Sequence, residues 1–125
     1  MKNLIIDAAA NKIFFKIIAV NKSYTSDYPN SRENFDKFMI LLFSFLNENK
    51  INIKEINNIF VNQGPGKFSG IRTSISVAKA LLISNKLNLY GFSTMDIKGN
   101  KYENIINLYK KGALTKNLIN AIYSS

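Results

Sequence analysis

A glycine-rich segment carries the residue types and spacing that come nearest to a known chemistry. It covers residues 64–70, with the sequence Gly64-Pro65-Gly66-Lys67-Phe68-Ser69-Gly70. An apolar run that predicts a strand precedes the segment, and a run that predicts a helix follows it. Backbone amides at the start of a helix can bind an anion such as phosphate. The segment therefore has two interpretations, a phosphate cradle or a tight structural turn.

Neither of the two common phosphate-binding motifs fits this segment. A Walker A loop has Ser or Thr after its Gly-Lys pair, whereas here Phe68 follows Lys67. A dinucleotide-binding fingerprint needs a third glycine where Ser69 stands. Pro65 also lacks the N–H group that a cradle would use. We favour the structural turn, whose backbone would be shaped by Gly64, Pro65, Gly66 and Gly70.

The acidic residues give weaker grounds for catalysis. Asp7 ends the first predicted strand, a position from which an acid could bind a metal or face a phosphate. The other aspartates lie on different predicted elements, so a general acid–base pair cannot be assigned. The sequence has no histidine and no cysteine, which excludes zinc sites and both Ser-His and Cys-His catalysis. We expect no catalytic residue, no metal site and no cofactor.

Length and composition indicate one globular domain. The chain has 125 residues, of which 46% are apolar, and no cysteine is present to form a disulfide. No apolar run approaches the ~18 residues that a membrane span needs. An acid also follows the first strand too early for a signal peptide. We expect a cytoplasmic protein that has no membrane association.

The net charge leaves a nucleic-acid partner open. The formal charge is +9, from 17 Lys and Arg against 8 Asp and Glu. A basic chain suggests an anionic partner. Only two of these cations are arginine, the residue favoured for phosphate and base contacts, and the lysines are spread along the chain. A small basic RNA-binding module that acts alone is therefore the alternative function.

The apolar pattern predicts an α/β fold. Five strands are expected, at residues 4–6, 13–20, 23–28, 56–61 and 87–92. Four helices are expected, at residues 31–49, 71–85, 102–109 and 114–123. The first helix has more apolar residues than one buried face needs, so we expect a second cover, which another chain could supply. Together the elements predict a mixed five-stranded sheet with helices packed on it.

The glycine segment and its surroundings resemble the TsaB family. Residues 64–72 are similar to the family signature G-P-G-S-F-T-G-L-R. The match continues through residues 78–81, where the family has A-K-G-L, and through residues 91–96, where it has G-V-S-S-L-D. The first residues, Leu4 to Asp7, resemble the family's first strand. The resemblance covers about residues 1–96.

This resemblance implies both a fold and a role. The fold would be a single lobe of the actin-like ATPase (ASKHA) superfamily, formed by residues 1–96, with residues 97–125 as a short helical extension of the same domain. The role would lie in making threonylcarbamoyladenosine (t6A) in tRNA, next to the anticodon. In that family the protein is not the catalyst. It pairs with the catalytic subunit TsaD through its first two helices, and the ATPase TsaE joins the complex.

Three departures from the family pattern point away from independent catalysis. Family members usually have a second lobe, whereas this chain stops about 30 residues after the shared part. The family's D-T-S after the first strand is Asp7-Ala8-Ala9 here, so two hydroxyl groups are missing. The histidine that is frequent at the start of the family's first long helix is absent. Both pairing helices remain.

We therefore expect a non-catalytic scaffold subunit that pairs with a TsaD-like protein, reaches tRNA indirectly through the complex, and forms a homodimer when alone. The residues expected at the interface are Phe35, Phe38, Met39, Leu42, Phe68, Arg72, Ile75 and Lys79. Arg72 is the most specific of them, because a positive charge in the first turns of a helix opposes the helix dipole. A carboxylate on a partner would explain it.

Overall fold

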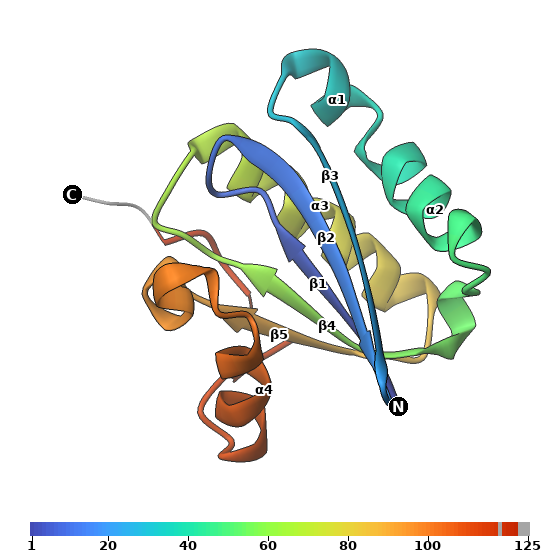
Figure 1. Ribbon diagram of the computed structural model, residues 1–125. Coiled ribbons are helices and arrows are strands. Elements are labelled where there is room, and N and C mark those ends of the chain that lie inside the picture. Colours follow the sequence, from blue (N-terminus) through green and yellow to red (C-terminus); the bar gives the residue numbers. More distant parts are fainter. Residues whose placement is uncertain (118, 123–125) are drawn as a thin grey trace.

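A six-stranded mixed sheet lies at the centre of the computed structural model, which describes residues 1–117 and 119–122 (Figure 1). The strand order is β3-β2-β1-β4-β5-β6. The strands are β1 (Lys2–Asp7), β2 (Lys12–Ala19), β3 (Lys22–Pro29), β4 (Ile56–Asn62), β5 (Asn88–Phe92) and β6 (Thr115–Lys116). Strands β1, β4 and β5 run parallel, and the others pair antiparallel. The five predicted strands are confirmed to within two residues at each end.

The prediction of a last helix at residues 114–123 is wrong over its described part. Thr115 and Lys116 instead add β6 to the free edge of β5. Asn117 then donates its backbone N–H to Leu89 at 2.7 Å, and its side chain accepts the Leu89 N–H at 3.2 Å. Bonds with the exposed edge of β5 thus outweigh a helical pattern that is local to the segment.

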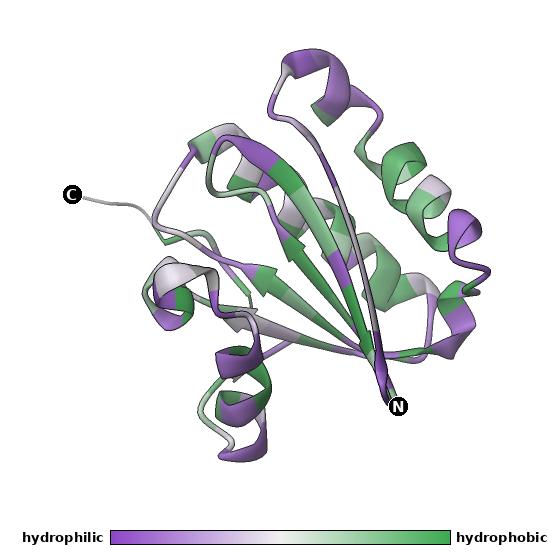
Figure 2. Ribbon diagram, viewed as in Figure 1, coloured by the Kyte–Doolittle hydropathy of each residue, from purple (hydrophilic) through white to green (hydrophobic). Residues whose placement is uncertain are grey.

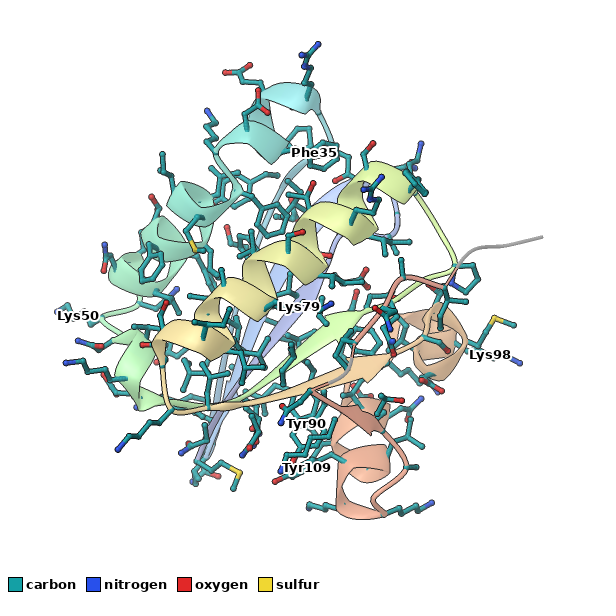
Figure 3. All side chains as sticks on the ribbon, turned by 180° about the vertical axis from the view of Figure 1, so that it is seen from behind. Phe35, Lys50, Lys79, Tyr90, Lys98 and Tyr109 are labelled. Atoms are coloured by element: carbon teal, nitrogen blue, oxygen red, sulfur yellow. The ribbon has the colours of Figure 1, made fainter. Side chains whose placement is uncertain are left out.

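Three helices cover one face of the sheet: α1 (Arg32–Asp36), α2 (Phe38–Glu48) and α3 (Phe68–Ser84). The single helix expected at residues 31–49 is divided, because Lys37 leaves the helical conformation (φ −117°, ψ 28°). Ser31 caps the first part, accepting the backbone N–H of Asn34 at 3.2 Å. The largest core cluster lies between these helices and the sheet. Seen from behind, α3 crosses the sheet diagonally beside α2 (Figure 3).

The opposite face is covered by the C-terminal part of the chain. A 3-10 segment, η2 (Thr94–Asn100), and the helix α4 (Glu103–Lys110) pack on β4 and β5. They enclose a second, smaller core that includes Ile5, Phe60, Phe92 and Ile105. Apolar residues are concentrated on the central strands β1 and β4, which have a helix layer on each side (Figure 2). This burial on both faces explains why these two strands are apolar rather than alternating.

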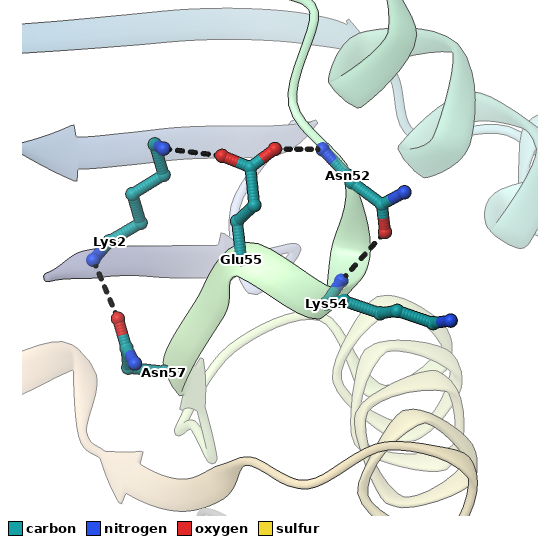
Figure 4. Close-up of polar contacts among 5 residues, drawn as sticks. All are labelled: Lys2, Asn52, Lys54, Glu55 and Asn57. Atoms are coloured by element: carbon teal, nitrogen blue, oxygen red, sulfur yellow. Dashed lines mark hydrogen bonds and ion pairs between the residues drawn. The ribbon is translucent and has the colours of Figure 1, made fainter.

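A polar cluster around Glu55 lies at the amino ends of the parallel strands β1 and β4 (Figure 4). Glu55 belongs to a short 3-10 turn, η1 (Ile53–Glu55), which Asn52 caps through the backbone N–H of Lys54. The Lys2 ammonium lies 2.5 Å from the Glu55 carboxylate, and this contact holds the pKa of Glu55 below its ordinary value. The Lys2 backbone N–H also donates to Asn57 at 2.9 Å. These contacts join the start of β1 to η1 and to the start of β4.

Candidate functional site

The glycine segment forms an elbow (residues 63–68) between β4 and α3, with a cis peptide bond between Gly64 and Pro65. Two of its backbone amides already have partners inside the protein. Lys67 donates to the Ala9 carbonyl at 2.7 Å, and Gly64 donates to the Asn62 side chain at 2.8 Å. Amides used in this way are not free to bind phosphate, which supports the structural-turn interpretation.

Close backbone contact explains the glycines of and beside the elbow. A Cβ atom on Gly66 would collide with the carbonyl of Ala9, and one on Gly70 would collide with the carbonyl of Ala8. Gly64 has φ +107°, a conformation that favours glycine. The start of α3 is therefore pressed against the connection that leaves β1, and only glycine allows the backbones to lie this close.

Asp7 lies at the carboxyl end of β1 and is 6% exposed. One carboxylate oxygen accepts the Tyr102 hydroxyl at 2.7 Å. The other accepts the Asn62 amide and the Ala9 backbone N–H, each at 3.1 Å. Thr94 joins the same network, accepting from Asn62 at 3.2 Å. Asp7 is thus held by its neighbours.

Sequence reasoning missed Asn62 and Tyr102 as partners of Asp7. Asn62 had a partial signal, because it directly follows a predicted strand. That strand, β4, pairs parallel with β1, so the carboxyl ends of the two strands meet. Tyr102 had none, since it lies 95 residues away from Asp7 in the sequence. Burial, together with the nearby Asp7 charge, raises the pKa of the Tyr102 hydroxyl, so this group remains a proton donor at neutral pH.

The space beside Asp7 is small. The hollow lined by Asp7, Asn62, Thr94 and Tyr102 has a volume of about 90 Å³. Pockets that bind small molecules are typically ~300 Å³ or larger. Among the described residues, no three acidic side chains are grouped so that they could hold a metal ion. The chain's own residues therefore fill most of the carboxyl edge of the sheet.

We expect the chain to bind ATP weakly and not to hydrolyse it. Tyr102 and the elbow occupy the carboxyl edge, and Ala8 and Ala9 offer no hydroxyl group to a phosphate. Isothermal titration calorimetry with Mg-ATP measures the affinity, and release of phosphate measures turnover. A dissociation constant of about 1 μM, or −8 kcal/mol, would contradict this prediction.

The expected interface residues divide into two groups. Phe38, Leu42 and Ile75 are 2%, 0% and 6% exposed, so they belong to the core of this chain and offer almost no surface to a partner. Phe38 packs against Phe15 of β2, with ring centroids 5.5 Å apart. The apolar excess of the helix at residues 31–49 is thus largely absorbed by its own sheet, and the interface prediction narrows to the remaining residues.

Of the remaining residues, Phe35, Phe68 and Arg72 lie near the elbow. Phe68, the first residue of α3, is 51% exposed. The Arg72 guanidinium lies 5.0 Å from the centre of the Phe68 ring. Met39 is half-buried on α2, and Phe35 lies beside the N-terminal end of α3 (Figure 3). Lys79 lies on the side of α3 away from α2.

Two hollows flank Phe68. One, of about 310 Å³, lies between Phe35 and the elbow. The other, of about 420 Å³, follows α3 from Phe68 past Arg72 to Val77. We call the surface formed by Phe35, Phe68, Arg72 and these hollows the elbow face. The interface residues expected from the sequence did not include Ile40 on α2 or Ile83 on α3, whose side chains are 66% and 86% exposed. Their exposure depends on how the helices dock, which the helical period alone does not give.

Comparison with known proteins shows which family the chain belongs to. The model of the family described as "TsaD: tRNA N6-adenosine threonylcarbamoyltransferase" matches residues 10–103. The chain belongs to this family. The match includes the elbow, α1, α2 and α3, so the features described above lie within the shared region.

Individual relatives confirm the resemblance to TsaB. The tRNA threonylcarbamoyladenosine biosynthesis protein TsaB of Buchnera aphidicola subsp. Schizaphis graminum is 31% identical over 98 residues, covering 78% of this chain and 47% of that protein. The tRNA N6-adenosine threonylcarbamoyltransferase of Fervidobacterium nodosum is 29% identical over 99 residues, covering 78% of this chain and 28% of that protein. The chain thus spans about half the length, or less, of these relatives.

A solved structure supports the fold. YeaZ from Pseudomonas aeruginosa superimposes with a TM-score of 0.72 at 16% identity, over 89% of this chain and 50% of that chain. Together with the family match, this likeness supports the expected actin-like ATPase type of fold, with six strands in the described sheet rather than five. No helix in the described part of the chain is long and apolar enough to cross a lipid bilayer.

Proposed function

We propose that this chain is a non-catalytic subunit of a cytoplasmic complex that makes t6A in tRNA, where it pairs with a TsaD-like catalytic subunit. Family membership and relatives named for t6A biosynthesis support the pathway. The observation that carries the pairing is the exposed Phe68–Arg72 pair on the elbow face. In this proposal a TsaE-like ATPase joins the complex, and tRNA is bound mainly through the catalytic subunit.

A non-catalytic role agrees with the chemistry of the described residues. Asp7 is held by three internal donors, and the hollow beside it is too small for a nucleotide. By contrast, the elbow face combines the exposed ring of Phe68 with the exposed cation of Arg72, and aromatic and arginine side chains are enriched at protein interfaces. The geometry therefore favours association over catalysis.

Co-expression with the TsaD homologue of the same organism tests this proposal. A tagged chain should retain that protein through affinity and size-exclusion chromatography at equal stoichiometry. An unrelated basic protein of similar charge, carrying the same tag, is the control for non-specific retention. If the folded chain elutes without the TsaD homologue, the proposed pairing is wrong.

In the absence of a partner, we expect the exposed surface of α2 and α3, which includes part of the elbow face, to join two copies of the chain. The exposed apolar side chains Ile40, Phe68 and Ile83 all lie on α2 and α3, and a second copy offers the same surface. Sedimentation velocity over a range of concentrations should show a monomer–dimer equilibrium. Adding the TsaD-like partner should replace the homodimer by a heterodimer. A single monomeric species at high concentration would contradict the shared surface.

A further inference from the structure

The C-terminal part of the chain has an unusual balance of charge. Residues 97–125 contain five cations and one acid, Glu103. Residues 1–96 contain twelve cations and seven acids. The five cations are Lys98, Lys101, Lys110, Lys111 and Lys116. All five side chains are exposed. They lie on or beside η2, α4 and β6, and we call the exposed surface of these segments the lysine face.

In the part of the chain that the structure describes, none of the five lysines forms an ion pair, and the exposed Glu103 is the one acid of their segment. Among the described residues the ion pairs are Lys2–Glu55, Lys12–Asp27 and Lys37–Glu33, and all three lie on other parts of the protein. The carboxylate of Asp96, the nearest acid in the sequence before Lys98, accepts the backbone N–H of Ser93 at 2.8 Å. The positive charge is therefore directed at solvent.

Helix stability explains only part of this arrangement. Lys110 and Lys111 lie at the C-terminal end of α4, where a positive charge complements the helix dipole. Lys98 and Lys101 precede the helix, and Lys116 lies on β6. Lys98, Lys101 and Lys116 therefore gain nothing from the dipole at the C-terminal end of α4. An external anion is a better explanation for the five lysines together.

Two tyrosines border the lysine face. Tyr90 and Tyr109 pack edge to face with ring centroids 5.1 Å apart, and both are half-buried (Figure 3). The Lys116 ammonium lies 5.9 Å from the centre of the Tyr90 ring. Burial and the neighbouring Tyr109 raise the pKa of Tyr90. The phenol is therefore neutral at physiological pH and does not repel a phosphate.

We propose that the lysine face binds RNA through its phosphate backbone. This inference rests on the proposed function, because a tRNA-modifying complex supplies RNA as the polyanion. Several exposed lysines that form no ion pair among the described residues give affinity for a polyanion without sequence specificity, through release of counterions. The segments η2 and α4, which with the residues beside them carry four of the five lysines, lie on the opposite side of the sheet from the three helices, so RNA and a protein partner can be bound together (Figure 1).

An anionic membrane fits this surface less well. Ile105 is fully buried, and Ile106 and Tyr109 pack against the sheet, so the apolar side of α4 faces inward. Helices that bind membrane surfaces turn their apolar side outward into the lipid. The charged side of α4 alone would give only an electrostatic contact with lipid.

The test compares two variants of equal net charge. The first replaces Lys98, Lys101, Lys110 and Lys111 by glutamine. The second, the matched control, replaces four exposed lysines elsewhere, Lys22, Lys50, Lys54 and Lys86, by glutamine. Fluorescence anisotropy measures the binding of each to an unmodified tRNA transcript at ~50 and ~200 mM salt. Vesicles of phosphatidylglycerol serve as the second probe.

The unaltered chain should bind tRNA with an affinity that falls steeply as salt rises. The first variant should bind at least tenfold more weakly with a shallower salt dependence, while the control keeps most of the affinity. Equal losses in both variants, or a stronger dependence of vesicle binding than of tRNA binding on the four lysines, would overturn the proposal. If the first variant fails to fold, a salt slope of the unaltered chain shallower than about −2 would overturn it instead. The chain is tested alone, so failure here is distinct from failure to retain the TsaD-like partner.

Discussion

Replacing Gly70 by alanine is expected to lower the free energy of unfolding by about 3 kcal/mol or more. The added Cβ atom would collide with the carbonyl oxygen of Ala8, a backbone atom beside the end of β1. Both groups lie in well-packed structure: Gly70 and Ala8 are buried, and β1 is a central strand of the sheet. A backbone atom there cannot swing aside as the end of a flexible side chain could. Urea unfolding followed by circular dichroism measures the change.

The neighbouring residue supplies the control for this substitution. Ser69 is exposed on the same turn of α3, so Ser69→Ala should change the unfolding free energy by less than about 0.5 kcal/mol. A Gly70→Ala protein as stable as the Ser69→Ala protein would show that the start of α3 can move away from β1. The close backbone contact would then not be the reason for the glycine. A partly folded Gly70→Ala protein should also lose its TsaD-like partner.

The helices and strands could be predicted from the local sequence pattern, except at the C-terminal end. The centres of β1 and β4 are short continuous apolar runs, and β2 is rich in β-branched and aromatic residues, which are local signals. The helix break at Lys37 could not be predicted, because the apolar residues on either side of it continue the helical pattern. Strand β6 was missed because its two residues gain their conformation from the edge of β5 rather than from their own propensity.

The candidate site could be predicted only in part, because part of it depends on contacts between residues far apart in the sequence. The glycine segment predicted a turn, since glycine and proline act on the backbone locally. The burial of Phe38, Leu42 and Ile75 depends on how α2 and α3 dock on the sheet, so a helical wheel could not separate them from the exposed Phe68. Tyr102 and Asp7 lie 95 residues apart in the sequence, and no motif or spacing predicts their contact.

Substitutions on the elbow face should have the largest effect on association with the TsaD-like subunit. Arg72→Glu is expected to lower the affinity at least tenfold, or ~1.4 kcal/mol. Phe68→Glu is expected to lower it at least a hundredfold, because a charge would replace an aromatic ring that the partner buries. Both side chains are exposed in the isolated chain, so neither change should reduce its thermal stability by more than a few degrees. Binding titrations, with thermal melts of each variant, measure both quantities.

Lys86→Glu separates a local contact from a general charge effect. Lys86 is exposed beyond the C-terminal end of α3, and its replacement changes the net charge by the same amount as Arg72→Glu. If long-range attraction alone held the partner, the two variants would lose affinity equally, and both losses would fade as salt rises. A contact of Arg72 with a partner carboxylate instead predicts a loss confined to Arg72→Glu that persists at high salt, because a buried ion pair is weakly screened. Unchanged affinity in a well-folded Arg72→Glu protein would remove Arg72 from the interface, and unchanged affinity in Phe68→Glu would move the pairing surface away from the elbow altogether.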